Sequence, residues 1–174
     1  ESQNWSIISA TDDTTIAEYT NSSLGLEESV KVNTQAVTMM KFTLPETVNP
    51  FEVQSATLIF TDYLQYGNME IEVYVGSNDW NEGTDSVSGA SRHYKDYGSS
   101  TRWMAVGSDW IDATGTLAGD VPFATQFIAD LDKAQKIEID VTDVVYASGE
   151  NEVTIILKAN GGNHAIASKE HPIE

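Results

Sequence analysis

Residues 92–103, with the sequence RHYKDYGSSTRW, gather the side chains of this chain that are best suited to hold a ligand. The stretch contains three of the nine basic residues of the chain, interleaved with two tyrosines and a tryptophan. Flat aromatic rings can cover the apolar face of a sugar ring, while Arg and Lys donate hydrogen bonds to its hydroxyl or carboxylate groups. The predicted ligand-binding residues are Arg92, Tyr94, Lys95, Tyr97, Arg102 and Trp103.

The same stretch also has a purely structural interpretation. A long loop that folds onto the body of the protein would use its aromatic side chains as an additional core and its basic side chains to offset acidic repulsion. Both interpretations stay open at the level of the sequence. Two other tryptophans, Trp80 and Trp110, are expected to be buried.

Three acidic turns could hold a metal ion. Carboxylate oxygens are the ligands that calcium takes, and none of the turns has the spacing of an EF-hand. A solvated acidic cluster is the alternative in a chain with 27 Asp and Glu residues. The candidate calcium ligands are Asp12 and Asp13 in ATDDTT, Asp79 and Glu82 in NDWNEGTD, and Asp140 and Asp143 in DVTD.

The familiar catalytic patterns are absent from the sequence. His93, His164 and His171 lie far apart and have no zinc-ligand spacing, and there is no cysteine. There is also no nucleophile elbow and no phosphate-binding loop. We therefore predict a protein that is not an enzyme.

Composition limits the partners. Nine Lys and Arg residues against 27 Asp and Glu residues give a formal net charge of −18 over 174 residues. Such a charge argues against binding to nucleic acid or to anionic membranes. The longest apolar runs are too short to cross a bilayer, so no membrane insertion is expected.

The hydrophobic pattern has a period of two along most of the chain. Runs rich in Val, Ile, Thr and Tyr predict eight or nine strands, among them residues 35–44, 54–63, 69–77 and 151–159. In MEIEVYV, residues 69–75, apolar and polar side chains alternate, which predicts one buried and one solvated face. The predicted fold is an all-β, antiparallel β-sandwich of jelly-roll type with little helix.

Three segments depart from this pattern. VTDVVYASGE predicts one short helix, with Asp140 or Thr142 as N-cap and Gly149 as its end. FATQFIA, residues 123–129, fits a helix or a strand, and the surrounding β pattern favours the strand. Residues 84–120 predict a long, aromatic-rich loop within a single domain that spans residues 1–174, with an N-terminal extension over residues 1–10.

Several short elements follow one another along the chain. They are MKFTL at residues 40–44 leading to SATL at 55–58, the element of Asp79, Trp80 and Glu82, DVTDVV at 140–145, and Ser168-Lys169-Glu170. Taken in this order they resemble the DNRLRE domain, an extracellular β-sandwich of microbial surface proteins and of carbohydrate-binding modules. This resemblance implies a jelly-roll-like sandwich with a non-catalytic, mostly glycan-directed role. It also implies a location outside the cell or on its surface.

The resemblance raises an alternative function. Members of the family continue past the element at residues 168–170 into a further strand, which HPIE is too short to provide, and Pro172 lacks an N–H group. We therefore expect an open edge, of the kind that pairs with other chains. Trp5, Ile7 and Ile8 of a neighbouring copy are the predicted assembly residues, in a structural subunit of an extracellular filament or surface layer.

Overall fold

The computed structural model describes residues 5–169, which form an antiparallel all-β structure with one short α-helix. The prediction of an all-β antiparallel sandwich with little helix is confirmed. The elements are β1 (Asp12–Ala17), β2 (Ser29–Asn33), β3 (Ala36–Thr43), the 3-10 turn η1 (Pro50–Glu52), β4 (Thr57–Tyr66), β5 (Met69–Gly76), β6 (Tyr94–Asp96), β7 (Thr101–Arg102), β8 (Trp110–Ile111), β9 (Ala124–Ile128), β10 (Gln135–Asp140), α1 (Thr142–Ser148), β11 (Glu152–Asn160) and β12 (Asn163–Ala167).

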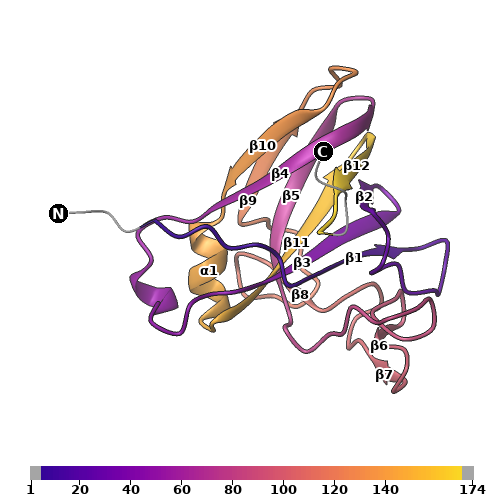
Figure 1. The fold of residues 1–174 in the computed structure, drawn as a ribbon, viewed down its shortest axis with the longest axis horizontal. Coiled ribbons are helices and arrows are strands. Elements are labelled where there is room, and N and C mark those ends of the chain that lie inside the picture. The colour runs from indigo at the N-terminus through magenta and orange to yellow at the C-terminus, as the bar shows by residue number, and fades with distance from the viewer. Residues whose placement is uncertain (1–4, 170–174) are drawn as a thin grey trace.

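Ten of the strands form one sheet that curls into two layers (Figure 1). We name the two layers independently of the view in Figure 1. The back layer has the strand order β10-β4-β12-β2. The front layer has the order β1-β3-β11-β5, and β8 and β9 both pair with β5. A single residue pair, Asn33 with Ala36, joins β2 to β3 at their turn. Because the two strands separate beyond this pair, the sheet can fold over and enclose a core.

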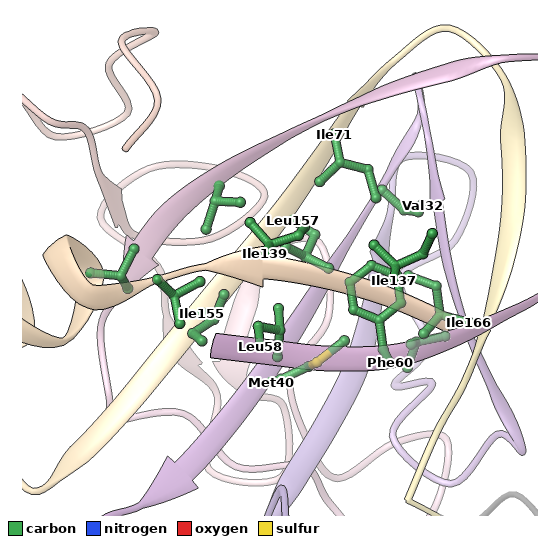
Figure 2. Close-up of a cluster of buried hydrophobic side chains, with 14 of the residues drawn as sticks. Val32, Met40, Leu58, Phe60, Ile71, Ile137, Ile139, Ile155, Leu157 and Ile166 are labelled. Atoms are coloured by element: carbon green, nitrogen blue, oxygen red, sulfur yellow. The ribbon is translucent and has the colours of Figure 1, made fainter. Parts of the chain in front are cut away.

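The main core lies between the two layers, and alternate residues of each strand supply it. Figure 2 shows Leu58, Phe60, Ile137 and Ile139 of the back layer gathered with apolar side chains of the front layer. The front-layer members labelled there are Met40, Ile71, Ile155 and Leu157. This is the arrangement that a period of two predicts for a sandwich.

The face of β5 that the sequence predicts to be solvated is only partly so. Glu70 is exposed and Glu72 is half-buried, but Tyr74 on the same face is 1% exposed. A second set of side chains therefore covers part of the outer face of the front layer.

The less regular predictions have mixed outcomes. Residues 124–128 form strand β9, as the surrounding β pattern favoured. Helix α1 ends at Gly149, which adopts the left-handed conformation at φ 63°. The predicted N-caps are wrong, because Val141 occupies the cap position without a side-chain hydrogen bond. Asp140 instead accepts hydrogen bonds from the backbone N–H and the hydroxyl of Thr142, at 3.0 and 2.6 Å.

The last described strand, β12, has partners on both sides. It pairs with β2 and with β4, so its backbone hydrogen bonds are provided by its own chain. Residues 170–174, on which the expected missing strand depended, lie outside the described residues. Within residues 5–169, the edge strands of the sheet, which pair with a neighbour on one side only, are therefore other strands than β12, and β9 and β10 are among them.

A buried hydrogen-bonded pair of side chains links β4 to β12 at one end of the core. Asp62 and His164 are each 1% exposed or less, and Nδ1 of His164 lies 2.8 Å from an Asp62 carboxylate oxygen. Nε2 of His164 lies 2.7 Å from the carbonyl oxygen of Gly67. A carbonyl only accepts, so Nε2 carries a proton, and Nδ1 and Asp62 share a second one. Desolvation by burial raises the pKa of Asp62, although the hydrogen bond from His164 acts in the opposite direction.

This pair predicts the pH dependence of stability. A folded-state pKa above the unfolded value of 3.8 means that the native state binds more protons than the unfolded chain, so stability is lost as pH rises through the folded pKa. Each unit of the shift is worth roughly 1.4 kcal/mol. In Asp62→Asn the amide can donate to Nδ1 without a charge, so the stability of the wild type relative to this variant should fall as pH rises.

Urea unfolding of both proteins at a series of pH values from about 3.8 upward measures this difference. A difference in unfolding free energy that stays constant, or that grows in favour of the wild type at higher pH, would contradict the assignment.

Candidate ligand-binding groove

The segment between β5 and β9, residues 77–123, is called the insertion, and part of it folds back onto the outer face of the front layer. Ile16, Met39, Tyr74 and Ile156 supply the sheet side of a second apolar cluster. Trp80, Ala90 and Trp103 of the insertion supply the other side, and all seven residues are at most 7% exposed. The insertion is thus a packed layer on the sandwich over this part of its length.

Both tryptophans of this cluster are held by hydrogen bonds as well as by packing. The indole N–H of Trp80 donates to the Thr154 hydroxyl at 3.0 Å, and that of Trp103 donates to the Ser91 carbonyl at 2.7 Å. Trp80 is buried as predicted. Trp103 was predicted to bind ligand, but it is 7% exposed and faces the sheet, so its ring is not available to a ligand in solvent.

Two buried aspartates organise the turns at the far end of the insertion. Asp109 accepts from the backbone N–H groups of Met104 and Ala105, at 3.1 and 2.7 Å. Hydrogen bonds, first from the Thr114 side chain and then from backbone amides, lower the pKa of Asp112 to about 2. A Cβ atom on Gly119 would lie 2.1 Å from Asp112 Oδ2, so this turn requires glycine at that position.

Two of the predicted calcium ligands belong to a cross-link between three segments of the chain. Glu82 accepts from the Asp13 backbone N–H at 2.7 Å and pairs with the Lys169 ammonium at 2.9 Å. The Lys169 backbone N–H in turn donates to Asp13 at 2.7 Å. A lysine ammonium therefore provides the positive charge beside Glu82, and the cross-link ties β1, the insertion and the segment after β12 together.

The other predicted calcium ligands lie at separate places. Asp12 accepts from the Thr11 hydroxyl at 2.9 Å, and Asp79 pairs with Lys95. Burial acts to raise the pKa of Asp79, but the hydrogen bonds from Lys95 and Ser77 outweigh it and lower the pKa. Asp140 and the exposed Asp143 both line one small cavity at the start of α1.

Across residues 5–169, no three His, Asp or Glu side chains converge as metal ligands do. Calcium binding stays a prediction.

The predicted ligand-binding residues divide into three groups. Tyr94 and Tyr97 stack with ring centroids 4.9 Å apart, and the Arg102 guanidinium lies 5.0 Å from the Tyr94 centroid, so these three form an aromatic-basic stack on the β6–β7 hairpin. Lys95 pairs with Asp79, and Trp103 packs in the second apolar cluster, so these two side chains hold the insertion in place. Arg92 lies apart from the stack and lines a groove.

This groove, with a volume of about 250 Å³, runs between the end of β1, the β2–β3 turn, the end of β11 and residues 106–110 of the insertion. Trp110, Arg92 and Lys158 are its largest polar or aromatic lining residues. The Lys158 ammonium lies 4.4 Å from the Trp110 ring centroid. Arg92 reaches across to donate to the Glu18 carbonyl oxygen at 2.7 Å.

The chemistry of the groove combines donors, acceptors and apolar walls. Asn33, Thr34 and Gln35 of the β2–β3 turn add amide and hydroxyl groups, and Val37 and Val106 add apolar surface. Two of the nine basic residues of the chain meet one acidic residue here, so the lining is locally cationic in a strongly acidic protein. Such a concave site, with a few polar groups converging on apolar walls, is typical of small-molecule and sugar binding.

Sequence reasoning found only Arg92 among these residues. Trp110 was expected to be buried, and it is half-buried, with its indole N–H donating to the Gly119 carbonyl at 2.8 Å. Lys158 lies near the end of the apolar strand β11, and a single lysine at such a position does not by itself predict a binding site. The groove residues come from five separate stretches of the chain, namely residues 16–18, 33–37, 92, 106–110 and 158–159, so only the fold brings them together.

Searches of protein-family models and of curated proteins found no match to this chain. The resemblance to the DNRLRE domain therefore stays a prediction. Among residues 5–169 there is also no helix with the length and apolar character that a membrane span requires.

The buried position of Trp103 leads to a prediction about stability. Trp103→Ala should destabilise the protein by about 3–5 kcal/mol, because it removes a large buried side chain and leaves a cavity under the insertion. Met104, its neighbour, is 78% exposed, so Met104→Ala should change stability by less than about 0.5 kcal/mol. Denaturant unfolding of the two variants measures both values, and equal, small effects would show that Trp103 does not anchor the insertion.

Proposed function

We propose that this chain is a non-catalytic glycan-binding module that acts outside the cell or on its surface. The ligand occupies the groove between the insertion and the front layer. The observation that carries this proposal is the lining itself, in which an indole, two cations and the polar groups of the β2–β3 turn meet in one concave site.

The composition of the lining favours a polyhydroxylated ligand. The side chains of Arg92 and Lys158 can donate hydrogen bonds to sugar hydroxyl groups, and that of Gln35 can both donate and accept them. Val106 and Trp110 offer apolar contact to a sugar ring. Neutral or cation-bridged polysaccharides are favoured over long free polyanions, because the net charge of −18 repels the latter. The groove supports the binding of a short stretch of such a chain.

The aromatic-basic stack of Tyr94, Tyr97 and Arg102 is the competing location for the same function. Tyr94 and Tyr97 cover one face of each other, and Arg102 also lies against Tyr94, so less ring surface is left for a sugar. The stack also lies outside the groove lining. Lys158 likewise covers part of the Trp110 ring, but the groove is concave and brings donors, acceptors and apolar side chains from several segments together, so it is the preferred site.

Binding measurements on four variants test the proposal. A glycan array with neutral and acidic polysaccharides identifies a ligand, and calorimetry then gives its affinity for each protein. Lys158→Met and Gln35→Ala in the groove should each weaken binding by about tenfold or more, which corresponds to about 1.4 kcal/mol. Tyr97→Ala in the stack should bind as the wild type does.

The matched control is Lys136→Met on the back layer, where Lys136 is exposed and pairs with Glu138 at 2.9 Å. It removes the same charge as Lys158→Met at a position outside the groove and should leave affinity unchanged. Loss of binding in Tyr97→Ala with normal binding in the groove variants would move the site to the hairpin. An array with no bound glycan would contradict the proposed function.

A further inference from the structure

Strand β9 is an edge strand without the usual protection against pairing. It pairs with β5 along one side only. Its five residues, ATQFI, include no charge and no proline, and Phe127 is 59% exposed. Natural edge strands are normally blunted by Lys, by Pro or by inward charges, because an open row of N–H and C=O groups templates another strand. The nearby edge strand β10, in contrast, exposes Lys136, Glu138 and Asp140.

The sandwich is open between β9 and β10. Each strand belongs to a different layer, and no backbone pairing between them joins the two layers in the part of the chain that the structure describes. A cavity of about 180 Å³ lies at one end of this opening, and its lining combines apolar residues (Phe123, Ala124, Val141 and Val144) with polar ones (Asp140, Thr142 and Asp143). A strand added to β9 would direct alternate side chains toward this gap.

Residues 5–10, WSIISA, have the properties of such an added strand. They belong to no strand of their own chain, and Trp5 and Ile7 are 74% and 101% exposed. The segment carries no charge, and its six residues are one more than the five of β9, enough to pair along the whole strand. Trp5 and Ile7 would lie on one face of a strand and Ile8 and Ala10 on the other, so both faces offer apolar contact.

We propose that residues 5–10 of one copy of this chain add as a β-strand to β9 of a second copy. Donor and acceptor lie at different places on the chain, so the contact is heterologous and each copy can bind one neighbour through each site. Unless the geometry closes a ring, repetition builds an open filament. The main force that opposes assembly is repulsion between copies that each carry a net charge of −18, so higher ionic strength should strengthen it.

Sedimentation velocity of the full chain over a concentration series tests this contact. The wild type should form oligomers that grow with concentration and with salt. The donor variant Trp5→Ser/Ile7→Ser and the acceptor variant Phe127→Lys should each self-associate about tenfold more weakly or worse. Thr125→Lys provides a second acceptor variant should Phe127→Lys fold poorly, and Met104→Lys is the control for a lysine placed at an exposed apolar position outside both sites.

Mixing the two defective proteins gives the sharpest result. The donor variant keeps an intact β9, and the acceptor variant keeps an intact residue 5–10 segment, so the mixture should form heterodimers that cannot grow further. Monomers at all concentrations for the wild type, oligomers that survive both sets of substitutions, or a mixture that stays monomeric would each overturn the proposal. Glycan binding by the edge variants should stay normal, so failure of this contact is distinguishable from failure of the proposed function.

Discussion

The outer face of the front layer is apolar where β1, β3, β11 and β5 lie side by side, and it has to be covered. Met39, Tyr74 and Ile156 are each 1% exposed or less although they point away from the main core. Burial of one such side chain stabilises a fold by roughly 1.5–3 kcal/mol, so the covering layer is a large part of the stability. The insertion provides that cover with Trp80 and Trp103, and its position determines where the groove forms and where the basic residues gather.

The groove is one consequence of this cover. The groove lies at the border between the insertion and the sheet, where residues 106–110 are next to the β2–β3 turn and the end of β11. Ile16, Val37 and Trp110 belong both to the groove lining and to the second apolar cluster or the residues packed against it, so the groove walls are part of a packed region. Preformed walls reduce the ordering cost of binding.

The few basic residues of this acidic chain gather at the joins between the insertion and the sandwich. Lys41 donates to the Trp80 carbonyl at 2.9 Å, and Lys158 lies over Trp110. Arg92 reaches the Glu18 carbonyl, and Lys169 pairs with Glu82. Four of the nine basic residues therefore link the insertion to the sandwich, while Lys95 pairs with Asp79 within the insertion. Two of the predicted calcium ligands, Asp79 and Glu82, thus each have a lysine as partner.

The sequence predicts the strands far better than the site, for a physical reason. The sequence of β4 shows the alternation of a half-buried strand, and that of β11 shows a continuous apolar, β-branched run. The loop residues Trp103 and Tyr97 give no such local signal, because whether each is buried depends on residues far away in the sequence. Trp103 belongs to one buried cluster with Met39 and Ile156 of distant strands. The cap of α1 differs from the predicted one because Asp140 bonds locally to Thr142. The short strands β6, β7 and β8 carry too few residues to show a period.

Amide hydrogen exchange over the insertion tests most directly whether it is a packed layer that shapes the groove. The N–H groups of Ala90, Met104 and Ala105 all have partners within the insertion. They should exchange slowly, with protection that approaches that of the β11 amides, because their exposure requires the tryptophan cluster to open. Exchange of these amides at the rate of an unstructured peptide, while β11 stays protected, would contradict the account.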